Sequence, residues 1–222
     1  MKNKIKSIIN NVKAQYNNTR LCAGVDCIKD NIKKTASVLA KHGITANMVS
    51  ICGFTLGMLA VNCLANGAYN LALLLILVNR YGDALDGAIA KIKGKTDFGV
   101  FLDASLDYIF YAAVIFGFAM ANPADNALAA SFLLFGFATS ACALLAYGVI
   151  AHAKNTNVLN ESPFYLGGLA QGAETVTAFV LLCIVPNWFV SVALILGCWC
   201  LIKSLLVVSS AYFNFVIAAK GK

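Results

Sequence analysis

Residues 42–79 read "HGITANMVSICGFTLGMLAVNCLANGAYNLALLLILVN", and this stretch contains no Lys, Arg, Asp or Glu. Residues 126–153 and 175–202 are two further runs without these charges. Each run is long enough to cross a bilayer at least once, because a spanning helix needs about 20 mostly apolar residues. The mean hydropathy of +0.76 and the charged fraction of 12% also argue against a soluble domain. The sequence therefore predicts an all-α integral membrane protein.

Turn-forming residues divide the chain into six predicted transmembrane helices. The turns "ANGAYN", "KGKTD", "ANPADN", "HAKNTNVLNESP" and "VPN" are rich in Gly, Pro and Asn, which favour chain reversal. The predicted spans cover residues 46–66, 69–90, 98–122, 126–151, 163–185 and 188–216. We expect two parts of the chain, a surface segment at 1–45 and a six-helix membrane domain at 46–222.

Lys and Arg are concentrated on one side of the predicted bundle. With the N-terminus in the cytoplasm, the inside segments 1–45, 91–97, 152–162 and 217–222 hold fifteen of the seventeen Lys and Arg residues. The outside loops hold none, and the other two lie within spans. This distribution follows the positive-inside rule and predicts both termini on the cytoplasmic side. The compact single-domain size points to a bacterial inner membrane.

The N-terminal segment is basic and amphipathic. It holds nine of the Lys and Arg residues within the first 43 positions, and its apolar residues repeat at helical spacing. This pattern predicts one or two helices on the cytoplasmic surface of the membrane, bound to anionic lipid headgroups. A soluble helical hairpin would have the same pattern. Because the positive charge lies beside a membrane domain, nucleic acid is not an expected partner.

Four acidic residues fall on two neighbouring helical stripes at a predicted cytoplasmic turn. Asp83 and Asp86 are three residues apart on the second span, and Asp103 and Asp107 are four apart on the third, so each pair shares a helix face. The short turn makes the two helices antiparallel neighbours, and the four carboxylates can converge. Asp97, in the turn, lies off both stripes and is expected to be solvated.

Converging carboxylates repel one another unless cations lie among them. Ligand sets made only of oxygen suit one or two hard divalent ions such as Mg, Mn or Ca, and two such ions can clamp a displacement at phosphorus. The eight cysteines form no CxxC pair, so a zinc site is not expected. The other interpretation is that two of the acids form buried ion pairs with Arg80 and Lys91.

Residues 83–107 resemble the signature of the CDP-alcohol phosphatidyltransferase family, D-x2-D-G-x2-A-R-x8-G-x3-D-x3-D. The fixed positions met here are Asp83, Asp86, Gly87, Ala90, Gly99, Asp103 and Asp107. The family architecture, six spans behind an N-terminal surface helix, is also similar. Two features depart from the signature. Lys91 replaces Arg, and seven residues instead of eight separate Lys91 from Gly99. A Lys keeps the positive charge but loses bidentate recognition of phosphate.

The resemblance implies a metal-dependent transfer of a phosphatidyl group from CDP-diacylglycerol, or a related CDP-alcohol, to a small alcohol, with release of CMP. Asp83, Asp86, Asp103 and Asp107 would hold two Mg or Mn ions. Asp107 would also accept the proton of the attacking hydroxyl, and the protein would be a homodimer.

Five residues are expected on the nucleotide side of the site: Gly87, Ala90, Lys91, Gly99 and Asn47. Gly87 and Ala90 would leave space for the nucleotide, although close helix packing also favours small residues. Thr45 and Asn47 open the first span, where a helix cap is the other interpretation.

The acceptor side is less defined by the sequence. We expect its pocket to be lined by His152, Lys154, Glu174 and Lys203. Glu174 and Lys203 could equally form a structural ion pair. These residues leave the identity of the acceptor open.

Three other functions are compatible with parts of the pattern. One is transfer of a phosphorylated amino alcohol from its CDP derivative to a lipid alcohol. Another is transport of divalent cations, because carboxylates within spans also mark ion pathways; such a site is expected near mid-membrane beside broken helices. The last is an inactive lipid-binding scaffold, which the complete set of four acids disfavours.

Overall fold

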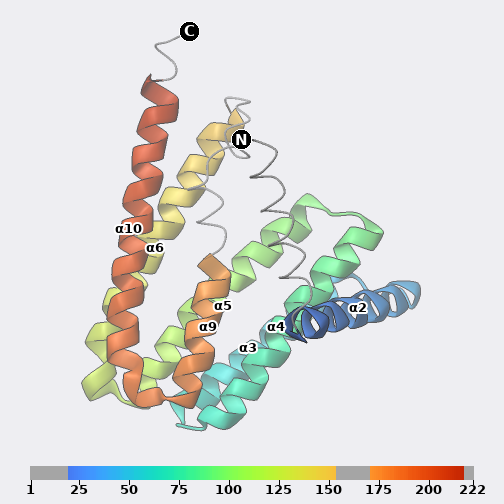
Figure 1. Ribbon diagram of the computed structural model, residues 1–222, viewed down its shortest axis with the longest axis horizontal. Coiled ribbons are helices and arrows are strands. Elements are labelled where there is room, and N and C mark those ends of the chain that lie inside the picture. The colour runs from blue at the N-terminus through green and yellow to red at the C-terminus, as the bar shows by residue number, and fades with distance from the viewer. Residues whose placement is uncertain (1–19, 154–170, 218–222) are drawn as a thin grey trace. The chain divides into compact units, whose positions relative to one another are not determined.

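The computed structural model describes residues 20–153 and 171–217, and every regular element within these ranges is a helix (Figure 1). The main helices are α2 (Arg20–Lys41), α3 (Ala46–Ala65), α4 (Tyr69–Lys93), α5 (Asp97–Ala121), α6 (Pro123–Ala153), α9 (Gln171–Ile184) and α10 (Phe189–Tyr212). Two short segments, η1 (Pro186–Trp188) and η2 (Phe213–Ile217), precede and follow α10.

Within the described ranges, four helical stretches are long and apolar enough to cross a membrane: Ala46–Ala65, Asp97–Ala121, Pro123–Ala151 and Pro186–Val216. They agree with the all-α membrane class predicted from the sequence. The other two predicted spans overlap α4, whose C-terminal half carries four charged residues, and α9, whose apolar part is shorter, at Gly172–Ile184. The total of six spans therefore stays a prediction.

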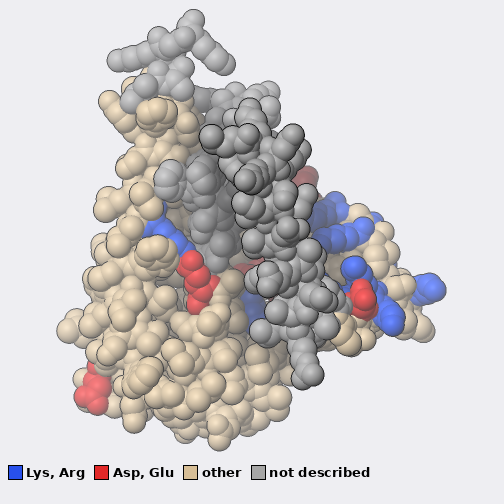
Figure 2. Space-filling view, in the orientation of Figure 1, with Lys and Arg blue, Asp and Glu red and all other residues tan. Residues whose placement is uncertain are grey.

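Helix α2 occupies the described part of the basic N-terminal segment, while residues 1–19 lie outside the described ranges. On one face of α2, Ile32, Ala36 and Leu39 pack around Leu85 and Ile89 of α4. This contact anchors the helix to the protein by apolar burial, at about 25 cal/mol per Å². Lys and Arg side chains gather over α2 (Figure 2). The contact of α2 with lipid headgroups stays a prediction.

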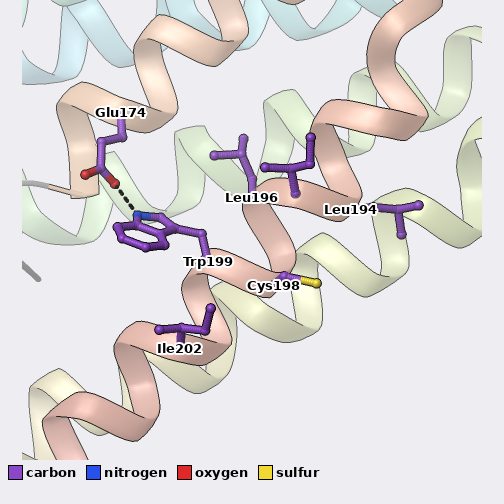
Figure 3. Close-up of a pocket in the computed structure, with 7 residues that line it drawn as sticks. Glu174, Leu194, Leu196, Cys198, Trp199 and Ile202 are labelled. Atoms are coloured by element: carbon purple, nitrogen blue, oxygen red, sulfur yellow. Dashed lines mark hydrogen bonds between the residues drawn. The ribbon is translucent and has the colours of Figure 1, made fainter.

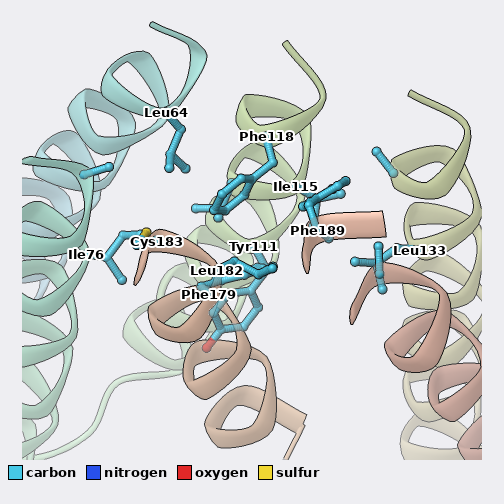
Figure 4. Close-up of a cluster of buried hydrophobic side chains, with 14 of the residues drawn as sticks. Leu64, Ile76, Tyr111, Ile115, Phe118, Leu133, Phe179, Leu182, Cys183 and Phe189 are labelled. Carbon is cyan, nitrogen blue, oxygen red and sulfur yellow. The ribbon is translucent and has the colours of Figure 1, made fainter. Parts of the chain in front are cut away.

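The chain divides into two compact units that share three helices. The first consists of Met1–Gly53 and Asn79–Leu106, and the second of Phe54–Val78 and Asp107–Lys222. The second unit has the larger core, in which Phe118 stacks on Phe189 and Tyr111 meets Phe179 (Figure 4). Aromatic residues of this size dominate the energetics of a packed core.

Helices α6 and α10 lie side by side in the second unit and pack closely at two glycines (Figure 1). A Cβ atom at Gly136 would lie 2.7 Å from the backbone oxygen of Gly197, and one at Gly197 would lie 2.7 Å from the ring of Phe132. The missing side chains therefore permit the close approach of the two backbones.

Gly136→Ala is expected to destabilise the protein, because the new methyl group meets backbone that cannot turn away. Overpacking of this kind costs about 1–3 kcal/mol. Thermal unfolding in detergent measures it, with Gly87→Ala as the control, since a Cβ at Gly87 meets no atom within 4 Å. Equal unfolding temperatures for wild type and Gly136→Ala would contradict the close packing.

Candidate active site

Three of the four predicted acidic ligands come together in the first unit. Asp83 and Asp86 on α4 and Asp103 on α5 each offer one carboxylate oxygen, and these three atoms lie within 4.8 Å of one another. The i, i+3 spacing puts the first two on one face of α4. Gly94, with a φ of 96°, follows the last residue of α4, and this left-handed conformation favours glycine in the turn toward α5.

The donor set fits a hard divalent cation. All three ligand groups are carboxylates, which suit Mg or Mn better than softer metals. Asp86 is only 5% exposed, so its charge is removed from water and gains the most from a nearby cation. In the described residues, one oxygen from each of the three carboxylates converges on the same place, as ligands of one cation would.

Two of the acids have partners that orient them. The Ser50 hydroxyl of α3 donates a hydrogen bond to Asp86 Oδ2 at 2.6 Å. Arg80 Nη1 lies 3.6 Å from Asp83 Oδ2, which confirms the predicted contact between these two residues. Arg80 also donates to Asn79 Oδ1, and Asn79 Nδ2 donates to the backbone oxygen of Gly53 at 2.8 Å. Lys91 is exposed and takes part in no ion pair recorded among the described residues.

Asp107 lies one helical turn beyond Asp103 on α5, at the start of the second unit. Its side chain is half-buried, and Oδ2 accepts a hydrogen bond from the hydroxyl of Tyr111 at 3.4 Å. The described three-carboxylate cluster does not include it. Its role as a fourth ligand and as a proton acceptor stays a prediction.

A cleft of about 410 Å³ in the first unit adjoins the carboxylates. It is lined by Asp86 and Asp103 and by all five residues predicted for the nucleotide side: Asn47, Gly87, Ala90, Lys91 and Gly99. The structure thus places the basic, small and acidic residues of the motif around one cleft. Lysines are also among the residues that line the cleft, and their positive charge suits an anionic ligand.

The two motif glycines differ in what surrounds them. A Cβ atom at Gly87 would meet nothing within 4 Å, so packing within the described residues does not require glycine there. At Gly99 a Cβ atom would lie 2.9 Å from Thr96 Oγ1 and 3.1 Å from Asn47 Oδ1. Gly99 is therefore a close-packing position, whereas Gly87 leaves space open toward the cleft.

The helix cap at the start of α3 is made by Thr45, whose hydroxyl accepts the Met48 N–H at 3.4 Å. Asn47 instead directs its side-chain oxygen toward Gly99. Each of the two interpretations made for this polar pair therefore applies to one residue. Thr45 caps the helix, and Asn47 lines the cleft.

Sequence reasoning missed several residues of the cleft. Ser50, Lys93, Lys95 and Thr96 all line it, and Lys93 Nζ donates to the backbone oxygen of Ile44 at 2.8 Å. A signal was present for Ser50, because it lies three residues after Asn47 on a helix that has few polar residues. For Lys93 and Lys95, positive charge was the one feature of the sequence that could have indicated a place in the cleft.

The predicted acceptor residues are only partly described. Lys203 on α10 forms an ion pair with Glu174 on α9, as one of the two interpretations expected. Trp199 Nε1 donates to the same carboxylate at 3.0 Å (Figure 3), and the Lys203 ammonium lies 5.4 Å from the Trp199 ring centre. Glu174 and Trp199, but not Lys203, line an apolar groove of about 590 Å³. Lys154 and the side chain of His152 lie outside the described residues.

Comparison with known proteins adds a second observation. Residues 43–211 match the family described as CDP-alcohol phosphatidyltransferase. The chain is 44% identical over 190 residues to Inner membrane protein YnjF of Escherichia coli, covering 84% of this chain and 92% of the relative. It is 36% identical over 94 residues to Archaetidylinositol phosphate synthase of Pyrococcus horikoshii, covering 42% of this chain and 50% of that protein. No solved structure matches the chain.

The family match extends over most of the membrane domain and includes the whole cleft from Thr45 to Asp103. The acidic motif, the helices that carry it and the sequence relatives agree, and the chain belongs to the CDP-alcohol phosphatidyltransferase family.

Proposed function

We propose that this protein transfers a phosphatidyl group from CDP-diacylglycerol, or a related CDP-alcohol, to a small alcohol and releases CMP. The observation that carries the proposal is the position of three carboxylates at a cleft lined by the small and basic residues of the same motif. The family membership supports transfer from a CDP-alcohol, and the long apolar helices support a lipid substrate.

The acids of the motif would hold one or two Mg or Mn ions. When bound, such ions offset the negative charge of the diphosphate and of the departing CMP. Asp83, Asp86 and Asp103 would be the main ligands, supported by the convergence of their oxygens. Asp107 would be a further ligand.

The chain's residues would then direct the displacement. Asp107 accepts the proton of the acceptor hydroxyl, which must lie within hydrogen-bond reach. The hydroxyl oxygen forms a bond to the lipid-linked phosphorus, and the bond from that phosphorus to the bridging oxygen of CMP breaks. Lys91, Lys93 and Lys95 line the cleft and bring positive charge to the phosphates.

The acceptor remains a choice among small alcohols. One relative is named Archaetidylinositol phosphate synthase, and three lysines at the cleft are compatible with an acceptor that carries phosphate. Glu174 is already paired with Lys203, which weakens the argument from its charge for an amino alcohol. The homodimer implied by the resemblance is part of the proposal.

Cation transport is the second candidate, and the helices disfavour it. Helix α4 continues from Tyr69 to Lys93 and α5 from Asp97 to Ala121, so neither breaks at an acid. Transporter sites in the membrane commonly use half-broken helices whose ends face the ion. The carboxylates lie in the last turns of α4 and the first turns of α5, near the connecting turn.

A product assay tests the proposed function. The purified protein is mixed with CDP-diacylglycerol, Mg²⁺ or Mn²⁺, and a panel of alcohols that includes phosphorylated and amino alcohols. We expect one new lipid and an equal amount of CMP, both detected by mass spectrometry, and both lost with a chelator. No lipid product across the panel, together with cation flux into protein-containing vesicles, would favour the transporter.

Gly87→Ala is expected to lower kcat/KM for the CDP-alcohol by about 10- to 100-fold. Its methyl group would enter space reserved for the nucleotide, and overpacking costs about 1–3 kcal/mol. Gly82→Ala is the matched control on the same helix, because its Cβ would lie 3.6 Å from Gly53 Cα in ordinary contact. Equal loss in both variants would point to helix packing instead of nucleotide space.

A further inference from the structure

The hydroxyl of Ser50 makes a short contact with the most buried acid of the cluster. Ser50 Oγ lies 2.6 Å from Asp86 Oδ2 and 3.1 Å from the backbone oxygen of Ala46. A hydroxyl has one proton to donate, and 2.5–2.7 Å is the usual range for a hydroxyl donating to a carboxylate. The hydroxyl therefore donates its proton in the shorter contact, to Asp86. This hydrogen bond joins Ser50 of α3 to Asp86 of α4, which lie 36 positions apart in the sequence.

The burial of Asp86 makes this bond matter more than a surface contact would. Asp86 is 5% exposed, whereas Asp103 is exposed and Asp83 is intermediate. The terminal torsion of an Asp side chain has a broad energy minimum, so a free carboxylate rotates easily. A buried carboxylate that loses a donor also has little water to replace it.

We propose that Ser50 is a positioning residue for the divalent cation site. Its hydrogen bond holds the Asp86 carboxylate in the orientation in which its ligand oxygen lies near those of Asp83 and Asp103. The inference rests on the metal site of the proposed function. It adds a residue outside the acidic motif, on a third helix, to the group that determines metal affinity.

The simpler alternative is a serine that only satisfies its own helix. Serines in apolar helices often bond the carbonyl four residues earlier, and Ser50 has such a contact with Ala46. Ser131 shows the simple case, with Oγ at 2.8 Å from the backbone oxygen of Ala127. Ser131→Ala is therefore a matched control that removes a helix bond without touching an acid.

Binding of Mn²⁺ alone tests the inference without any turnover. Purified wild type, Ser50→Ala, Ser50→Thr and Ser131→Ala are titrated with Mn²⁺, and free Mn²⁺ is measured by electron paramagnetic resonance. We expect the Kd of Ser50→Ala to rise about 10- to 100-fold, as is usual when a residue that orients a ligand is removed. Ser50→Thr keeps the hydroxyl and should stay within about threefold of wild type, as should Ser131→Ala.

The outcomes separate the two proposals. Unchanged Mn²⁺ affinity in Ser50→Ala, or a loss in Ser50→Thr equal to that in Ser50→Ala, overturns the role of Ser50 and leaves the metal site intact. A wild-type protein that binds no Mn²⁺ overturns the metal site and the role of Ser50 with it. If Ser50→Ala does not fold, as thermal unfolding would show, Ser50→Cys replaces it, because its thiol is similar in shape but a weak donor.

Discussion

Asp107→Asn is expected to lower the rate of CMP release by about 100- to 10,000-fold, the usual contribution of a general base. Asparagine has nearly the shape of aspartate but cannot accept the proton of the attacking hydroxyl. Because Asp83, Asp86 and Asp103 converge without Asp107, the variant should still bind Mn²⁺. The measurements are CMP release under saturating substrate and Mn²⁺ affinity on the same sample.

The control for this prediction lies on the same helix. Asp97 is exposed at the first turn of α5, so Asp97→Asn makes the same chemical change away from the cluster. It should leave CMP release within about twofold of wild type, as for a surface substitution. Wild-type turnover in Asp107→Asn would rule out its role as the proton acceptor, whatever the metal affinity.

Asp86→Asn is expected to abolish turnover and to weaken Mn²⁺ binding by more than about 100-fold, beyond the usual effect of removing an orienting residue. It removes the charge of the ligand that is 5% exposed. In the absence of metal, however, the same substitution should make the protein more stable. A buried carboxylate close to two others is unfavourable without a cation, so the metal-free variant should unfold at a higher temperature than the metal-free wild type.

Thermal unfolding with and without Mn²⁺ tests both the loss of metal binding and the gain in metal-free stability. A ligand that binds only the folded state raises its stability, so Mn²⁺ should raise the unfolding temperature of wild type and of Asp97→Asn. It should have little effect on Asp86→Asn. A lower unfolding temperature for the metal-free Asp86→Asn variant would show that the buried charge is already well compensated by its protein neighbours.

The sequence predicted the helices well where the membrane or the local turn decides their bounds. Helix α3 begins after its cap at Thr45 and ends before Gly67, whose φ is 71°, and both residues belong to local patterns. Helix α4 extends to Lys93, beyond the predicted end at residue 90. A lysine is favourable in the last turn of a helix because of the helix dipole, so the start of the charged region marked the end of the span too early.

The site was predictable to the extent that it depends on helical periodicity. Asp83 and Asp86 share a face through their spacing, and the turn brings Asp103 back to them. Ser50 could not be assigned to Asp86 in this way, because the rotation of α3 relative to α4 depends on side-chain packing and not on local spacing. The pairing of Glu174 with Lys203 was only one of two options for the same reason.

The division of the chain into two units has a consequence for its assembly. The first part of the first unit ends at Gly53, within α3, and its second part begins at Asn79, within α4. The segment Phe54–Val78 between these two parts belongs to the second unit. No single cut of the polypeptide therefore separates the carboxylate cluster and its cleft from the large aromatic core. Each unit is topologically discontinuous, and neither can be produced as one uninterrupted fragment.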